Sequence, residues 1–92
     1  MTALGGGAVL RFLPHVKFRY DERRQAWIVL APEKLFMPDE QAAEILRLVD
    51  GTRTVDDIID ALAAEYDAPR ADIAADVTAM LQDLVDKRVL QQ

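Results

Sequence analysis

The 92-residue sequence contains no cysteine and no serine, and these two absences exclude most covalent catalysis. Without cysteine there is no disulfide, no thiolate nucleophile and no Cys-ligated metal centre. The single histidine, His15, therefore has no partner for a Ser/His/Asp or Cys/His arrangement. The chain also lacks a GxGxxG motif, a P-loop and any run that resembles an EF-hand loop. We expect no enzymatic activity, no metal and no cofactor.

Long apolar runs are missing as well. No 18-residue apolar stretch occurs, and no apolar run follows a basic region near the N-terminus. We expect a protein without a membrane span or a secretion signal, for which the cytoplasm is the default location. A chain of this length forms one small domain, with little room for the concave apolar site that a catalytic carboxylate pair needs.

Positive charge is in the minority, because 11 Lys and Arg face 16 Asp and Glu, a net charge of −5. This balance opposes non-specific binding to nucleic acid and to anionic membranes. Residues 1–38 contain six basic and three acidic side chains, whereas residues 39–92 contain five basic and thirteen acidic ones. The split predicts either a functionally polarised surface or a basic hairpin that merely lies beside solvated acidic helices.

The N-terminal part of the chain carries the β-type patterns. Residues 1–10, with three consecutive glycines, predict a flexible lead-in to a single domain of residues 11–92. From Val16 to Tyr20, apolar and basic residues alternate as in a half-buried strand. The apolar run at residues 27–30 is typical of a strand that is covered on both faces.

A third run, Lys34-Leu35-Phe36-Met37, lies between Pro32 and Pro38 and has no obvious strand to pair with. An unpaired apolar strand is a place where another chain can add, and prolines and charges guard such edges against aggregation. We predict a three-stranded antiparallel sheet over about residues 16–37. The same edge could pair or exchange a strand with a second copy, so a homodimer is a hypothesis.

Helical periodicity fills the remainder of the chain. Helices are predicted at about residues 39–50, 54–66 and 69–88, the first of them ended by Gly51. Because the strands come first and the helices follow, the predicted fold class is α+β. Val89-Leu90 either folds back onto the domain or remains an unpaired tail.

The third predicted helix divides into three sectors at 100° per residue. The apolar stripe consists of Ile73, Val77, Met80, Leu81 and Leu84. One shoulder of the stripe is acidic and consists of Asp72, Asp76 and Asp83; the other has only small side chains, Ala71, Ala74, Ala75 and Thr78. Small residues let another segment approach closely, although alanine also simply favours a helix and aspartate simply solvates one.

Strands combined with three short helices also suggest a winged-helix DNA-binding regulator. A recognition helix needs Lys and Arg to neutralise phosphates. The third predicted helix instead carries four aspartates, with basic residues only near its ends. The basic hairpin at residues 19–24 is the feature that keeps this alternative open.

Several segments in series resemble pyrroloquinoline quinone (PQQ) biosynthesis protein D. They are Phe18-Arg19-Tyr20-Asp21, the run from Trp27 to Glu33, Asp39-Glu40 opening a helix that ends in Asp50-Gly51, Arg53-Thr54-Val55 opening the next, and Ala68-Pro69 before the last. The resemblance covers about residues 10–92. It implies a winged-helix-like domain that acts as a non-catalytic peptide chaperone, the founding type of the recognition domains for ribosomally made, modified peptides.

The resemblance also implies partners and a binding site. The partners are the precursor peptide of PQQ and a radical S-adenosylmethionine (SAM) enzyme that joins a glutamate and a tyrosine of that peptide. In the family the peptide adds beside the third strand and lies against the third helix. The corresponding positions here are Lys34, Leu35, Phe36, Met37, Ile73, Val77, Met80, Leu81 and Leu84. Which of the helix side chains face the peptide is left open.

Overall fold

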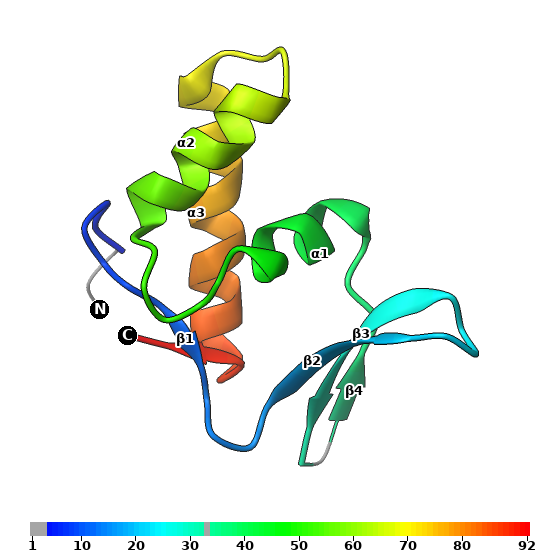
Figure 1. The fold of residues 1–92 in the computed structure, drawn as a ribbon. Helices are drawn as coiled ribbons and strands as arrows, with labels where there is room; N and C mark the ends of the chain where they lie inside the picture. The colour runs from blue at the N-terminus through cyan, green and yellow to red at the C-terminus, as the bar shows by residue number, and fades with distance from the viewer. Residues whose placement is uncertain (1–3, 33) are drawn as a thin grey trace.

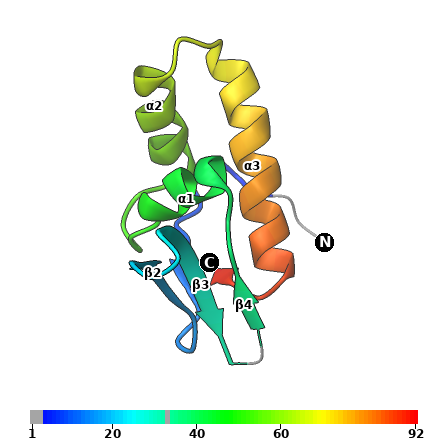
Figure 2. The same cartoon turned by 90° about the vertical axis from the view of Figure 1, so that its right-hand side faces the viewer.

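The computed structural model describes residues 4–32 and 34–92. Along the chain, its elements are β1 (Arg11–Phe12), β2 (Lys17–Asp21), β3 (Ala26–Ala31), β4 (Lys34–Phe36), α1 (Glu40–Arg47), α2 (Val55–Glu65), α3 (Arg70–Asp86) and β5 (Leu90–Gln91). Figures 1 and 2 show α1 between the β2-β3-β4 sheet and the neighbouring helices α2 and α3. The predicted α+β class, an antiparallel sheet followed by three helices, is confirmed.

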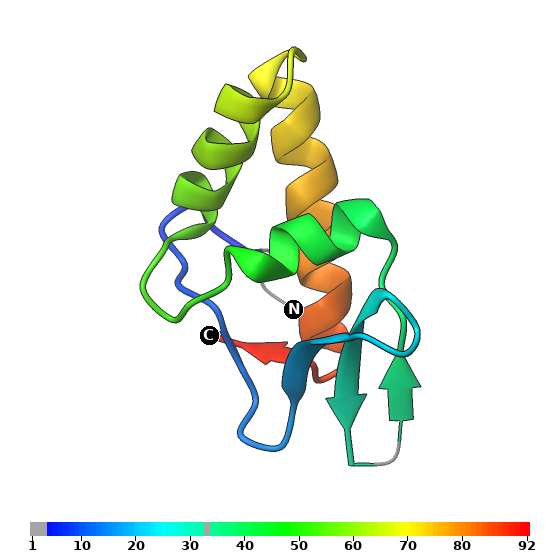
Figure 3. The same ribbon diagram turned by 45° about the vertical axis from the view of Figure 1, so that its right-hand side comes forward.

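The three longer strands form an antiparallel sheet in chain order, β2-β3-β4 (Figure 3). Val29 of β3 pairs with Phe36 of β4, so the expectation that the third run has no strand to pair with is wrong. The central strand pairs on both of its edges, and Ile28 and Val29, which are each 1% exposed, show that it is covered on both faces as predicted. The edge of β4 that faces away from β3 has no strand partner among the described strands.

Trp27 joins the sheet to α1. The ring of Phe18 stacks on that of Trp27 with their centroids 4.7 Å apart, and Tyr20 meets Trp27 edge to face. From α1, the guanidinium of Arg47 lies 5.4 Å from the centroid of the Trp27 ring, within cation–π range. These contacts hold α1 beside the sheet.

Residues 4–10 pack against the domain, which differs from the predicted flexible lead-in. Leu4 and Leu10 are 8% and 1% exposed and belong to the hydrophobic core. The three glycines predict flexibility, but the leucines on either side of them bury enough apolar surface to order the segment. Residues 1–3 of the predicted lead-in lie outside the described residues.

The same segment also caps α2. The carbonyls of Gly6 and Ala8 accept hydrogen bonds of 2.9 Å from the N–H groups of Asp56 and Val55. Those N–H groups belong to the first turn of the helix and have no intrahelical acceptor. A Cβ atom at Gly6 would meet the Asp56 carboxylate, so this close approach suits glycine.

The end of the chain folds back, which resolves the alternative left open for it. Leu90 of β5 pairs with Phe12 of β1, and Val89 and Leu90 are each 1% exposed. Arg88, with φ of 65°, makes the left-handed turn between α3 and β5. Strands β1 and β5 therefore close the core below the helices.

The helix boundaries agree with the predictions at α2 and α3 but not at the end of α1. Thr54 and Asp57 form the capping box that begins α2. Helix α1 ends at Arg47, three residues before the predicted end at residue 50. The carboxylate of Asp50 instead accepts hydrogen bonds from the N–H groups of the next turn, in which Gly51 has φ of 79°.

Candidate functional site

The open edge of β4 is the first component of the site. Among the strands that the structure describes, β4 pairs with β3 alone. Its opposite edge therefore presents backbone N–H and C=O groups without a strand partner, which is the property that allows another chain to add. Leu35 and Met37 in this segment are 44% and 57% exposed, so apolar surface lies along the open edge.

An apolar cavity of about 200 Å³ lies beside this edge, between β4, α1 and α3. We call it the edge groove. It is lined by Val29, Phe36, Met37, Pro38, Ala42, Leu46, Met80, Asp83, Leu84, Lys87 and Val89. Val29, Leu46 and Val89 are buried and make its floor, whereas Phe36, Met80 and Leu84 are half-buried and make its walls.

The rim of the edge groove carries one ion pair on α3. Lys87 Nζ lies 2.9 Å from the Asp83 carboxylate one turn earlier, and both side chains are more than half exposed. Such a pair contributes only about 0–1 kcal/mol to stability, so its charges can turn to an incoming polar group at little cost.

The structure brings four of the nine predicted site residues together in the edge groove: Phe36, Met37, Met80 and Leu84. Lys34 and Leu35 belong to β4 but do not line the groove. Val77 and Leu81, which are 2% and 0% exposed, face the core. Ile73 lines a different cavity, to which Val77 also contributes.

Other groove residues are missing from the sequence-based set. Ala42 and Leu46 on α1 look like ordinary members of a core stripe, because nothing in a single sequence tells which side of that stripe meets β4. In the sequence, Asp83 is part of the acidic shoulder of this helix, and Lys87 is a charge at its end. Neither the edge groove nor the cavity that Ile73 lines includes a residue of the small shoulder predicted for close approach.

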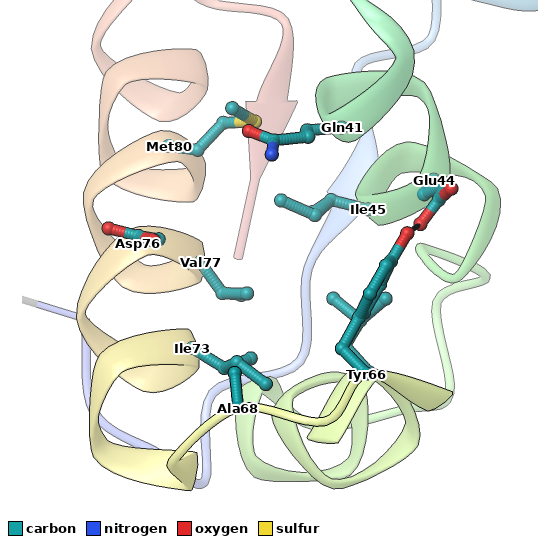
Figure 4. A pocket seen from close by; sticks show the side chains of 10 residues that line it. Gln41, Glu44, Ile45, Tyr66, Ala68, Ile73, Asp76, Val77 and Met80 are labelled. Atoms are coloured by element: carbon teal, nitrogen blue, oxygen red, sulfur yellow. Dashed lines mark hydrogen bonds between the residues drawn. The ribbon is translucent and has the colours of Figure 1, made fainter. Parts of the chain in front are cut away.

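The second cavity, the helix cavity, has a volume of about 240 Å³ and lies between α1, α2 and α3 (Figure 4). The residues that line it are Gln41, Glu44, Ile45, Leu62, Tyr66, Ala68, Ile73, Asp76, Val77 and Met80. The Tyr66 hydroxyl donates a hydrogen bond to the Glu44 carboxylate at one side of the cavity. That hydrogen bond to a carboxylate favours the protonated phenol and raises the pKa of Tyr66 to about 12.

Neither a metal-binding cluster nor a membrane-spanning helix occurs in the described part of the chain. Over residues 4–32 and 34–92, no group of three His, Asp or Glu side chains is placed to hold a metal ion. In the same part of the chain, no helix has both the length and the apolar character needed to cross a bilayer. An open strand edge beside an apolar groove is the arrangement of domains that bind an extended peptide as an added strand. Fold and site thus define a small α+β domain with an open strand edge beside an apolar groove.

Comparison with known proteins identifies the family. The model of the family "Coenzyme PQQ synthesis protein D (PqqD)" matches residues 26–90, and the chain belongs to this family. A PqqA binding protein of Rhodopseudomonas palustris (strain HaA2) is 58% identical over 78 residues, which are 85% of this chain and 76% of that protein. The resemblance expected from the sequence is confirmed.

Two solved structures share the fold. The solution NMR structure of the PqqD part of Methylobacterium extorquens PqqCD matches with a TM-score of 0.81 and 44% identity over 99% of this chain and 97% of that one. That protein is described as a functional, stand-alone recognition element for ribosomally synthesised and post-translationally modified peptides. Lasso peptide synthetase B1, complexed with its leader peptide, has a TM-score of 0.79 at 18% identity over 92% of this chain and all of that one, and shows the fold alone.

Proposed function

We propose that this protein is a non-catalytic peptide chaperone of PQQ biosynthesis, which binds the precursor peptide PqqA as a strand added to the open edge of β4. The observation that carries the proposal is the position of that edge directly beside the apolar edge groove. The relative that is 58% identical is named for binding PqqA, which supplies the identity of the peptide. A peptide that fits this site is an extended chain with apolar side chains.

The register of the β3–β4 hairpin indicates which backbone groups face the peptide. Ala31 pairs with Lys34 across a connection of two residues, and in such a turn the N–H of the fourth residue points to the C=O of the first. The N–H of Lys34 is therefore directed to β3. Because successive residues of an antiparallel strand alternate, the N–H and C=O of Leu35 are directed away from β3. Leu35 is the residue of β4 that offers both groups to an added strand.

The side chains of β4 alternate in the same way. Phe36 shares a sheet face with its partner Val29, and both line the edge groove. Leu35 shares the opposite face with its partner Leu30. A peptide residue that lies opposite Phe36 therefore directs its side chain into the groove, and its two neighbours direct theirs outward. The groove selects an apolar residue at that one position, while the backbone of Leu35 binds the peptide main chain whatever its sequence.

The proposal needs no catalytic group on this chain. Backbone hydrogen bonds supply affinity and the groove supplies selection, so the covalent step belongs to a separate enzyme. We propose the radical SAM enzyme of the pathway as that partner, which receives the peptide while it is held in an extended conformation. The alternative of a winged-helix DNA-binding regulator has no support from the comparisons, and the four aspartates of α3, Asp72, Asp76, Asp83 and Asp86, are all exposed.

The same edge also provides a route to a homodimer. Two copies whose β4 edges pair would cover their exposed Leu35 and Met37 side chains. We propose that this pairing competes with the peptide. Light scattering at high protein concentration should show dimers that PqqA dissociates, and a monodisperse monomer would contradict the pairing.

Titration of ¹⁵N-labelled protein with synthetic PqqA tests the proposed function. Amide shifts are expected at residues 34–37 and along the C-terminal half of α3, and their absence would refute the site. A matched pair of variants adds a binding readout. Leu84→Asp places a charge in the edge groove and should abolish binding, whereas Ala79→Asp adds the same charge to an exposed position of α3 and should not. Circular dichroism of both variants checks that the fold is kept.

A further inference from the structure

The β2-β3-β4 sheet has one face that no described helix covers. Successive residues of a strand point to opposite faces, and residues paired across strands share a face. Val29 and Phe36 share the face that borders the edge groove, where α1 and α3 lie. The opposite face, which we call the outer sheet face, carries Lys17, Arg19, Asp21, Ile28, Leu30 and Leu35. In Figure 2 no helix of the described chain lies in front of β3 and β4.

The centre of the outer sheet face is apolar. Leu30 is half-buried and pairs with Leu35, which is 44% exposed. Ile28 is 1% exposed but does not belong to the hydrophobic core that contains Val29. Its partner on this face is Arg19, a residue type whose stem covers apolar surface while the guanidinium stays in water. The cover of this face is therefore a layer of exposed side chains, which a second protein can replace.

One side of the outer sheet face is basic. Lys17 and Arg19 on β2 are both exposed, and neither forms an ion pair within the described part of the chain. Asp21, the acidic residue of this face, is already paired with Arg24 at 2.6 Å. Residues 39–92, by contrast, contain five basic and thirteen acidic side chains. The positive charge is thus local to the sheet, and it favours a partner surface that carries carboxylates.

The peptide proposed for the edge of β4 extends this same face. An added strand lies about 4.8 Å from β4, so the peptide side chains beside Leu35 project from the outer sheet face. On the other face, α1 and α3 close the groove around the peptide. A protein that has to reach the bound peptide therefore meets the outer sheet face as it approaches. The enzyme that modifies the peptide is such a protein.

We propose that the outer sheet face is the docking surface for this modifying enzyme. The inference rests on the proposed function and adds to it the face on which the enzyme binds. The matching enzyme surface has apolar side chains over Leu30 and Leu35, and carboxylates beside Lys17 and Arg19.

The size of the face sets the strength of docking. Three strands about 4.8 Å apart and at most about 20 Å long make a contact far smaller than the about 800 Å² per partner of a stable complex. Docking is therefore weak and readily reversed. The peptide, as a fourth strand, enlarges the face by about a third.

A matched pair of charge reversals tests the docking face. Arg19→Glu changes the outer sheet face, whereas Arg11→Glu makes the same change at an exposed position of β1, in the other sheet. Biolayer interferometry with the purified radical SAM enzyme is done without PqqA, so that the peptide does not bridge the two proteins. Arg19→Glu should weaken binding roughly tenfold at low salt and less than about threefold at about 1 M salt, and Arg11→Glu should have little effect. Equal binding of the two variants would overturn the docking face.

Peptide binding separates this inference from the proposed function. Arg19 lies on β2, with β3 between it and β4, so Arg19→Glu should bind labelled PqqA as the original protein does. Unchanged enzyme binding together with intact PqqA binding would overturn the docking face and leave the proposed function standing. Failure of the original protein to bind PqqA would refute the proposed function itself. Arg19-dependent binding to phosphatidylglycerol vesicles, without binding to the enzyme, would overturn the choice of partner.

Cross-saturation NMR tests the face without any substitution. Saturation of the unlabelled enzyme should reduce the methyl signals of Leu30 and Leu35 in deuterated, methyl-labelled protein. The methyl signals of Ile58 and Ile59 in α2 should keep their intensity, because that helix lies away from the sheet (Figure 1). Loss of intensity in α2 without loss at Leu30 and Leu35 would overturn the inference.

Discussion

A proline at position 35 is the sharpest perturbation of the proposed strand addition. Proline has no N–H, and it is tolerated on an edge strand where the missing N–H would face away from the sheet. If the N–H of Leu35 is directed to the peptide, Leu35→Pro keeps the β3–β4 pairing and removes one hydrogen bond to the added strand. The variant should therefore fold and bind PqqA more weakly.

The size of the effect follows from the bond and its surroundings. A peptide hydrogen bond is worth about 0.5–1.5 kcal/mol net, and leaving the peptide carbonyl unpaired costs about 1–3 kcal/mol if water cannot reach it. Since Leu35 is 44% exposed, water partly reaches this edge. We expect a loss of about 1–2 kcal/mol, or roughly five- to thirtyfold in Kd.

Fluorescence anisotropy with labelled PqqA measures this loss, and Leu35→Ala is the control. Alanine removes the same outward-facing side chain but keeps the N–H, so it should change Kd less than about threefold. Thermal unfolding should show both variants folded. Equal affinities of the Pro and Ala variants would refute the assignment of the Leu35 N–H to the peptide.

Three further predictions concern stability and ionisation. Leu10→Ala should lower the free energy of unfolding by about 2–4 kcal/mol in urea titrations, because Leu10 is 1% exposed; a loss below about 1 kcal/mol would contradict the packing of the N-terminal segment. Glu44→Ala should lower the pKa of Tyr66 from about 12 toward 10, as followed by tyrosine absorbance. Because the pKa of Tyr66 is higher in the folded protein than in the unfolded chain, the hydrogen bond stabilises fully below pH 10, and its contribution disappears as the pH rises to about 12. An unchanged pKa of Tyr66 in Glu44→Ala would refute the role of this hydrogen bond. Backbone N–H groups donate hydrogen bonds to Asp50 and lower the pKa of its carboxyl, and the N–H of Arg53 has the largest effect. The contribution of Asp50 to stability is therefore present above pH 3.8 and is lost as the pH falls below that value. Asp50→Asn should therefore reduce the fall in the free energy of unfolding at acid pH. Parallel plots of this free energy against pH for the variant and the original protein would contradict the prediction.

The part of the fold that depends on local patterns could be predicted. Alternation and turn residues place the three strands, and 3.6-residue periodicity with a capping box places α2 and α3. The end of α1 could not be placed in this way. Val49 continues the apolar stripe and is 7% exposed, but it lies outside the helix, since burial alone does not require helical backbone.

Features that depend on distant contacts were beyond sequence reasoning. The glycines at residues 5–7 are ordered only because residues 4–10 meet the first turn of α2, more than forty positions away. The sequence shows the apolar stripe of α3, but it does not show which of the stripe residues face the core and which face the edge groove. Leu81 at one margin of the stripe enters the core, whereas Met80 at the other margin and Leu84 near the centre meet the edge groove. That division depends on where α1 and β4 pack, which a single sequence does not reveal.

Hydrogen exchange at the amide of Leu35 tests the central claim most directly. In the free monomeric protein, an N–H directed away from β3 exchanges rapidly, while the amides of β3 between two strands are protected. Saturation with PqqA should slow exchange at Leu35 strongly, because the added strand accepts its hydrogen bond, and should leave the amides of β3 nearly unchanged. Tight binding of PqqA without any slowing at Leu35 would contradict strand addition at β4.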